Sequence, residues 1–306
     1  MSTPTGPASG LPVRMPRPRQ SGRHRRPEPV VAPEGAAALV LAVPGTPSCP
    51  ADRCPGQVIA SDAELPGLNA RIGYLDGDDA EYPTLSSVLA HTAAERVARY
   101  EQAVAAGREV AEPTGAAAVV VPLLAGPDSE LIRRIRQAVM DSGTQVELTD
   151  VLGPHPLLAE ALHVRLSEAG LARADRARLF TVATAADGIV LATVGGEEAV
   201  RAAGITGMLL AARLAVPVMA AALDVEGSVA SIAEQLQNSG SAQLALAPYL
   251  VGPEVDPGLL DAAAKEAGCA TAEPLGAYPA IGKLVLSLYA TALGITPATP
   301  QGAQAH

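Results

Sequence analysis

Histidines and carboxylates are the side chains of this sequence that could bind a divalent metal or move a proton near neutral pH. The chain has 306 residues and five histidines. Four of them lie in the terminal tails or within predicted helices, where surface or packing roles are the simpler interpretation: His24, His306, His91 and His163. His155 lies instead in a predicted loop, Gly153-Pro154-His155-Pro156, and is the candidate imidazole of a site.

Carboxylates are concentrated in another predicted loop, at Asp76, Asp78, Asp79 and Glu81. Such a cluster could bind a hard cation or attract a divalent metal, and a solvated acidic loop explains it as well. Asp76 directly follows a predicted strand. We therefore take Asp76 and His155 as the candidate metal ligands and the candidate catalytic acid or base.

The elements that must position these residues occur in two copies. The sequence VVVPLLAGPD at 119–128 returns as LALAPYLVGPE at 244–254, with five residue pairs each 126 positions apart. The pairs are Pro122 with Pro248, Leu124 with Leu250, Gly126 with Gly252, Pro127 with Pro253, and Asp128 with Glu254. Each copy is an apolar run that ends at Gly-Pro and an acid, which predicts a buried strand and then a helix with the acid at its positive end.

Two further motifs repeat in the same order: 73–76 matches 221–224, and 152–157 matches 275–280. The chain is therefore interpreted as two copies of one α/β unit. In the second copy Tyr278 stands where the first has His155. Because tyrosine is a poor ligand there, an alternative role for His155 is to order the Gly-Pro-His-Pro turn.

Strand and helix patterns alternate in both halves. We expect strands at 37–43, 69–76, 116–124 and 145–149, then at 189–194, 217–223, 243–250 and 269–273. We expect helices at 85–105, 129–142 and 157–169, then at 197–214, 229–238, 257–267 and 280–293; Pro and Gly interrupt a further candidate at 49–63. The predicted fold is α/β, with two tandem domains, each a four-stranded parallel sheet flanked by helices. Ligands of such sheets bind off the carboxyl ends of the strands.

The expected domain limits follow the same pattern. Residues 1–35 are rich in Arg, Pro, Gly and Ser and are predicted to be a disordered basic tail; an arm that touches an acidic partner or RNA is the alternative. The two domains cover 36–170 and 187–294, joined by a connector at 171–186 and followed by a flexible end at 295–306.

Composition narrows the class of protein. Hydrophobic residues make up 48% of the chain and aromatic residues 2%, which predicts Ala, Val, Leu and Ile cores. A net charge of −10 argues against nucleic acid as the main partner, and no apolar run is long enough to span a bilayer. The three cysteines have neither a disulfide nor a zinc spacing, so free thiols in the cytoplasm are expected.

The four loops that follow the first-half strands resemble, in their order, those of the class II chelatases that insert cobalt or iron into sirohydrochlorin. The resemblance covers about 37–292, and its clearest parts are Val119-Val120-Val121-Pro122-Leu123-Leu124, Leu152-Gly153-Pro154-His155-Pro156-Leu157-Leu158 and Pro274-Leu275-Gly276. It implies a tandem chelatase-like fold, a tetrapyrrole substrate, and cobalt or iron as the divalent metal substrate. It also implies a site where the turn at Gly45 and Thr46, together with Gly126, could contact the tetrapyrrole; a tight turn explains Gly45 and Thr46 equally well.

The sequence departs from the family at the residues that carry the chemistry. Where the family has a histidine after its first strand, this chain has Pro44, followed by the expected Gly45-Thr46. Where the family has its second histidine, the chain reads Ala125-Gly126-Pro127-Asp128, and the family's acidic ligand corresponds to Asp76. Proline can neither hold a metal nor accept a proton.

Two functions follow from this comparison. The resemblance implies a sirohydrochlorin chelatase, a lyase of cobalamin or siroheme synthesis. The missing histidines indicate instead a catalytically degenerate paralogue that binds tetrapyrrole or metal or serves as a partner subunit. A monomer is expected because both halves lie in one chain.

Overall fold

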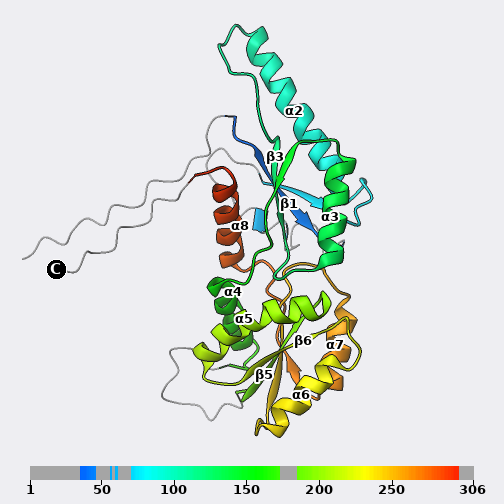
Figure 1. The fold of residues 1–306 in the computed structure, drawn as a ribbon, viewed down its shortest axis with the longest axis vertical. Coiled ribbons are helices and arrows are strands. Elements are labelled where there is room, and N and C mark those ends of the chain that lie inside the picture. The colour runs from blue at the N-terminus through cyan, green and yellow to red at the C-terminus, as the bar shows by residue number, and fades with distance from the viewer. Residues whose placement is uncertain (1–34, 46–55, 57–58, 61–69, 173–184, 296–306) are drawn as a thin grey trace, which may run out of the picture.

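The computed structural model describes residues 35–45, 56, 59–60, 70–172 and 185–295. Thr46, most of the interrupted stretch 49–63, most of the connector 171–186, and nearly all of both predicted tails lie outside the described residues. Within the described ranges, the chain forms two lobes, each built on one sheet (Figure 1).

The first lobe contains a four-stranded sheet in the order β2-β1-β3-β4. Its strands are β1 (Ala38–Val43), β2 (Arg71–Tyr74), β3 (Ala118–Pro122) and β4 (Val146–Leu148), and all pairings are parallel. The helices of this half of the chain are α2 (Leu85–Ala105), α3 (Ser129–Asp141) and α4 (Pro156–Glu168).

The second lobe repeats this topology, with its strands in the order β6-β5-β7-β8. The strands are β5 (Gly188–Thr193), β6 (Val218–Ala222), β7 (Leu244–Pro248) and β8 (Ala270–Thr271), again all parallel. The helices are α5 (Gly196–Leu214), α6 (Ser228–Asn238), α7 (Pro257–Glu266) and α8 (Pro279–Ala292).

The two sheets also agree in register. Pro122 of β3 pairs with Ala42 of β1, and Pro248 of β7 pairs with Ala192 of β5. The two prolines therefore occupy equivalent positions, as the repeated motifs predict. The predicted fold class, two tandem four-stranded parallel α/β units, is confirmed.

Side chains of the central strands alternate between the two faces of each sheet, as the pleat requires. In the first lobe, Val40 and Ala42 pack with buried residues of α2 and α3. On the opposite face, Leu39 and Leu41 belong to one hydrophobic cluster that continues into the second lobe and includes Leu191. The core on the inner faces is thus shared by both lobes.

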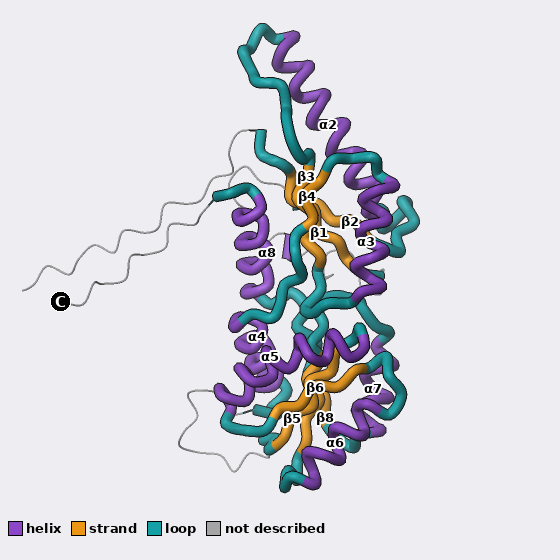
Figure 2. The backbone as a smooth tube through the Cα atoms, in the orientation of Figure 1, coloured by secondary structure: helices purple, strands orange, loops and turns teal. Residues whose placement is uncertain are grey.

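Two helices are exchanged between the halves of the chain. α4 comes from the first half but packs against β7 and α5 of the second lobe, and α8 packs against β3 of the first lobe (Figure 2). Tyr289 of α8 is buried, and its hydroxyl donates a 2.6 Å hydrogen bond to the carbonyl of Ala37, just before β1. The residues packed on each sheet therefore differ from the continuous segments 36–170 and 187–294.

Candidate functional site

Loops at the carboxyl ends of the two sheets meet at the junction between the lobes. A Cβ atom on Gly45, after β1, would lie 2.7 Å from the carbonyl oxygen of Pro253, after β7. Reciprocally, a Cβ atom on Gly195, after β5, would lie 2.7 Å from the carbonyl oxygen of Pro127, after β3. Both glycines have positive φ, +66° and +106°. Glycine is required at both places because a side chain would push the lobes apart.

A cleft of about 740 Å³ lies at this junction, in the range of ordinary ligand sites. The first lobe contributes Pro44, Gly45, Asp76, Leu131 and Arg134, and the second contributes the loop after β7 and the end of β8. The cleft is therefore where a doubly built α/β protein is expected to bind its ligand. Of the predicted site residues, Gly45 and Asp76 line it.

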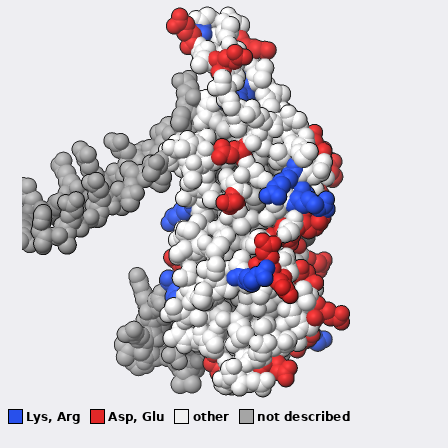
Figure 3. All heavy atoms as spheres, in the orientation of Figure 1, with Lys and Arg blue, Asp and Glu red and all other residues white. Residues whose placement is uncertain are grey.

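The cleft is predominantly acidic. Its carboxylates are Asp76, Glu254, Asp256, Asp261 and Glu273, and its one cationic side chain, among the described residues, is Arg134. Arg134 is paired with Asp76 in a partly exposed ion pair. On the face seen in Figure 3, acidic and basic side chains gather near the junction of the lobes. Cations are favoured in such a cleft over anions.

Glu254 differs from the other carboxylates of the cleft because one of its two oxygens is buried and unpaired among the described residues. Its Oε1 accepts a 2.8 Å hydrogen bond from the backbone N–H of Val251, whereas its Oε2 is buried and has no hydrogen-bond partner among the described residues. Other atoms of the residue remain partly exposed. Burial of the carboxyl, reinforced by the nearby charge of Asp128, raises its pKa to about 8.

The sequence pattern treats Asp128 and Glu254 as equivalent acids at helix starts, and this interpretation is right for Asp128 and wrong for Glu254. The carboxylate of Asp128 caps α3 by accepting from the N–H of Leu131 at 2.9 Å. In the second lobe the cap of α7 is Asp256, two residues later. Asp followed by Pro257 is a strong helix-start signal and could have shown that Glu254 has no capping role.

His155 is the N-cap of α4. Its Nδ1 accepts a 3.1 Å hydrogen bond from the N–H of Leu157, and partial burial lowers its pKa. It is not among the residues that line the cleft, and it does not meet Asp76 there. This geometry fits the alternative of an imidazole that orders its own turn.

Two predicted tetrapyrrole contacts remain: Thr46 lies outside the described residues, and Gly126 is not among the residues that line the cleft. Gly126 lies at the lobe junction, where a Cβ atom would be 3.5 Å from the ring of Tyr249. Tyr249 is buried and shares a 3.0 Å hydrogen bond with Thr206 of α5. Gly126 therefore supports packing between the lobes.

The acidic loop is organised by its own hydrogen bonds. Asp78 accepts from the N–H groups of Ala80, Glu81 and Tyr82, and Asp79 accepts from Thr84, so the pKa of each aspartate is lowered. In the described ranges, no group of three or more His, Cys, Asp or Glu side chains is placed to hold a metal ion.

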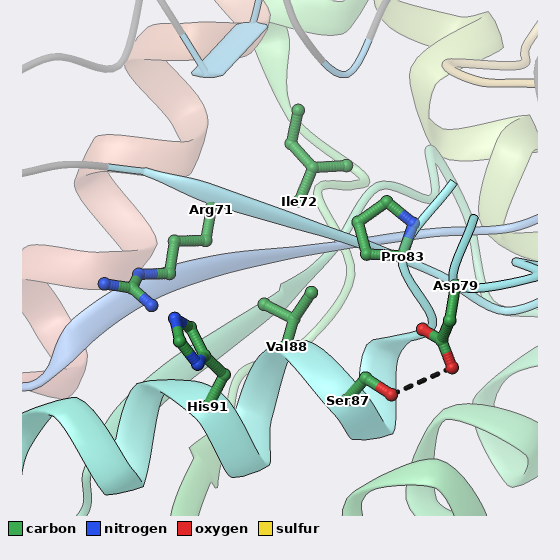
Figure 4. A pocket seen from close by; sticks show the side chains of 7 residues that line it. All are labelled: Arg71, Ile72, Asp79, Pro83, Ser87, Val88 and His91. Carbon is green, nitrogen blue, oxygen red and sulfur yellow. Dashed lines mark hydrogen bonds between the residues drawn. The ribbon is translucent and has the colours of Figure 1, made fainter. Parts of the chain in front are cut away.

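A second hollow, of about 600 Å³, lies beside β2 and α2 (Figure 4). Its charged groups are already satisfied: Arg71 and His91 both pair with Glu95, and Asp79 accepts from Ser87. It lies at the edge strand β2, and its described lining comes from the first lobe alone. The cleft between the lobes is therefore the better candidate site.

The chain matches no protein-family model and no curated protein sequence. The sirohydrochlorin chelatase SirB from Bacillus subtilis subspecies spizizenii, in complex with cobalt, is similar with a TM-score of 0.51 and 13% identity; the match covers 87% of this chain and 98% of that one. SirB from Bacillus subtilis with Fe3+ is similar with a TM-score of 0.53 and 14% identity, at the same coverage. At this identity the likeness shows a class II chelatase-like fold.

In the described part of the chain, no helix has the length and apolar character needed to cross a membrane.

Proposed function

We propose, from the fold it shares with sirohydrochlorin chelatases, that this chain binds a tetrapyrrole in the cleft between its lobes and inserts cobalt or iron into it. It would then be a lyase of cobalamin or siroheme synthesis, active in the cytoplasm as a monomer. The observation that carries the proposal is the 740 Å³ cleft at the facing carboxyl ends of two chelatase-like lobes. Leu131, Leu250 and Leu260 supply apolar surface there for a macrocycle.

The charge of the cleft matters for both substrates. The ionised carboxylates of the cleft attract a divalent cation, but they repel the acidic side chains of sirohydrochlorin. We therefore expect tetrapyrrole binding to tighten as salt screens this repulsion. The acidic groups of the tetrapyrrole would point out of the cleft, while its pyrrole nitrogens face inward.

A second candidate function is supported by the described lining of the cleft, which includes no imidazole. Pro44 lines it where the family has a histidine, Asp128 caps a helix, and His155 caps another. A degenerate paralogue that binds tetrapyrrole or metal without turnover, or that serves as a partner subunit, fits these residues.

The two functions are separated by incubating the purified protein with sirohydrochlorin and Co(II) and following the absorbance change on metallation. We expect turnover about 10²–10⁴-fold slower than that of a histidine-bearing chelatase, the usual cost of losing a positioned base. A bound tetrapyrrole spectrum without metallation would favour the paralogue, and no spectral change at all would refute both functions.

Three variants locate the site in the same assay. Asp76→Ala is expected to slow metallation, since Asp76 lines the cleft, whereas His155→Ala is expected to act through stability alone. Pro44→His restores an imidazole at the cleft wall and is expected to raise the rate. If Pro44→His binds sirohydrochlorin and metallates it at the wild-type rate, the reaction does not occur in this cleft.

A further inference from the structure

The second lobe has a carboxyl group that its helix does not use. The repeat makes Glu254 the counterpart of Asp128, but capping of α7 has passed to Asp256. Glutamate is also one methylene longer than aspartate, so its carboxyl reaches farther from the main chain. Glu254 is therefore available for a role other than helix capping.

One oxygen of this carboxyl is hydrogen-bonded, and the other is buried without a partner among the described residues. The N–H of Val251 holds Oε1 at 2.8 Å, and Oε2 is buried without a hydrogen-bond partner among the described residues. An unpaired buried carboxyl oxygen costs free energy and calls for a proton or another donor. Because Glu254 lines the cleft, a ligand bound there could supply that donor.

The unpaired oxygen, Oε2 of Glu254, also lies close to the first lobe. A Cβ atom built on Gly252 would lie 4.0 Å from this oxygen. The same Cβ atom would lie 3.7 Å from the side chain of Val43 and 3.8 Å from that of Pro44, both in the first lobe. The end of β7 therefore brings Glu254 to the region where the end of β1 presents proline in place of an imidazole.

We infer that Glu254 is the proton acceptor of the cleft, taking up the pyrrole protons that a divalent metal displaces. This inference rests on the proposed function. When the metal enters, each of two pyrrole N–H bonds breaks, its electron pair forms a nitrogen–metal bond, and its proton is released; no oxidant or reductant is needed. Oε2 of ionised Glu254 forms an O–H bond with the first proton; a side-chain movement that brings Oε2 to the cleft then releases this proton to water, and Oε2 accepts the second.

The protonation state of Glu254 determines how the metallation rate changes with pH. The carboxylate form is the base, and burial raises its pKa to about 8, so the competent fraction grows as the pH rises toward that value. The other charged groups that line the cleft with Glu254 are Asp76, Arg134, Asp256, Asp261 and Glu273, and Asp128 is a further charge close to it. Burial is the main reason why the pKa of Glu254 is high, and the like charge of Asp128 adds to it by disfavouring the ionised form.

The test is the rate of Co(II) insertion into sirohydrochlorin as a function of pH in wild type, Glu254→Gln and Glu234→Gln. Glu234 is exposed on α6, so its change to glutamine removes the same charge away from the cleft. Wild type and Glu234→Gln are expected to gain rate up to a plateau above about pH 8. Glu254→Gln is expected to lose about 10²-fold or more in rate, together with that pH dependence.

Infrared difference spectra give a readout that does not require activity. The C=O stretch of a protonated carboxyl should disappear as the pH is raised through about 8 in wild type and Glu234→Gln, and this change should be absent from Glu254→Gln. Equal metallation rates in wild type and Glu254→Gln, or no such infrared change in wild type, would overturn the role of Glu254 alone. No metallation by wild type at any pH would overturn the proposed function and this role together.

Discussion

Replacing Glu254 by glutamine is expected to change how the stability of the protein depends on pH. Glutamine keeps the size of the side chain and an oxygen that can accept from the N–H of Val251, but it cannot ionise. The substitution therefore removes one titration and leaves the packing of the loop in place.

The magnitude follows from the two pKa values of the carboxyl. The pKa is 4.5 in the absence of the fold and about 8 in the folded protein. Between these pH values the folded state retains a proton that the unfolded state releases, so stability falls as the pH rises. At about 1.4 kcal/mol for each pH unit, the full loss is on the order of 5 kcal/mol. Below 4.5 and above about 8, this group adds no further pH dependence.

Urea unfolding followed by circular dichroism at about pH 5 and about pH 9 measures the effect. From about pH 5 to about pH 9, the free energy of unfolding of wild type and of Glu234→Gln should fall by a few kcal/mol more than that of Glu254→Gln. Comparing the variants cancels the pH dependence that the three proteins have in common. If the difference in free energy of unfolding between wild type and Glu254→Gln is the same at both pH values, Glu254 ionises normally and the burial argument is wrong.

Three other predictions concern the junction and its loops. Tyr289→Phe should lower the free energy of unfolding by about 1–3 kcal/mol, because it leaves a buried carbonyl before β1 without its donor; denaturant titration measures this. Gly153→Ala should cost about 1–3 kcal/mol, since its Cβ would lie 2.5 Å from the carbonyl oxygen of Ala125, whereas Gly204→Ala meets no atom within 4 Å and should not destabilise. His155→Asn should retain the helix cap and melt near wild type, while His155→Ala should lose about 1 kcal/mol; equal losses in both would point to another role for the imidazole.

The sequence alone determined the local structure of this protein well. Apolar runs that end at Gly-Pro predicted β3 and β7, and the register confirms that Pro122 and Pro248 are equivalent. The helix expected at 85–105 has those bounds as α2, because Thr84 caps its start. These features depend on patterns within a few residues, such as turn residues, caps and apolar periodicity, which a sequence displays directly.

Only the tertiary structure decided how the two halves combine. The exchange of α4 and α8 depends on which apolar faces meet, and many helices of this composition could cover either sheet. The role of Glu254 in the candidate site was likewise decided by the tertiary structure. Asp128 and Glu254 occupy matching positions in the repeat, yet one carboxylate is satisfied by a helix end while the other is buried beside the opposite lobe. Burial and the lack of a partner are properties of contacts between residues far apart in the chain, so a repeated motif cannot reveal them.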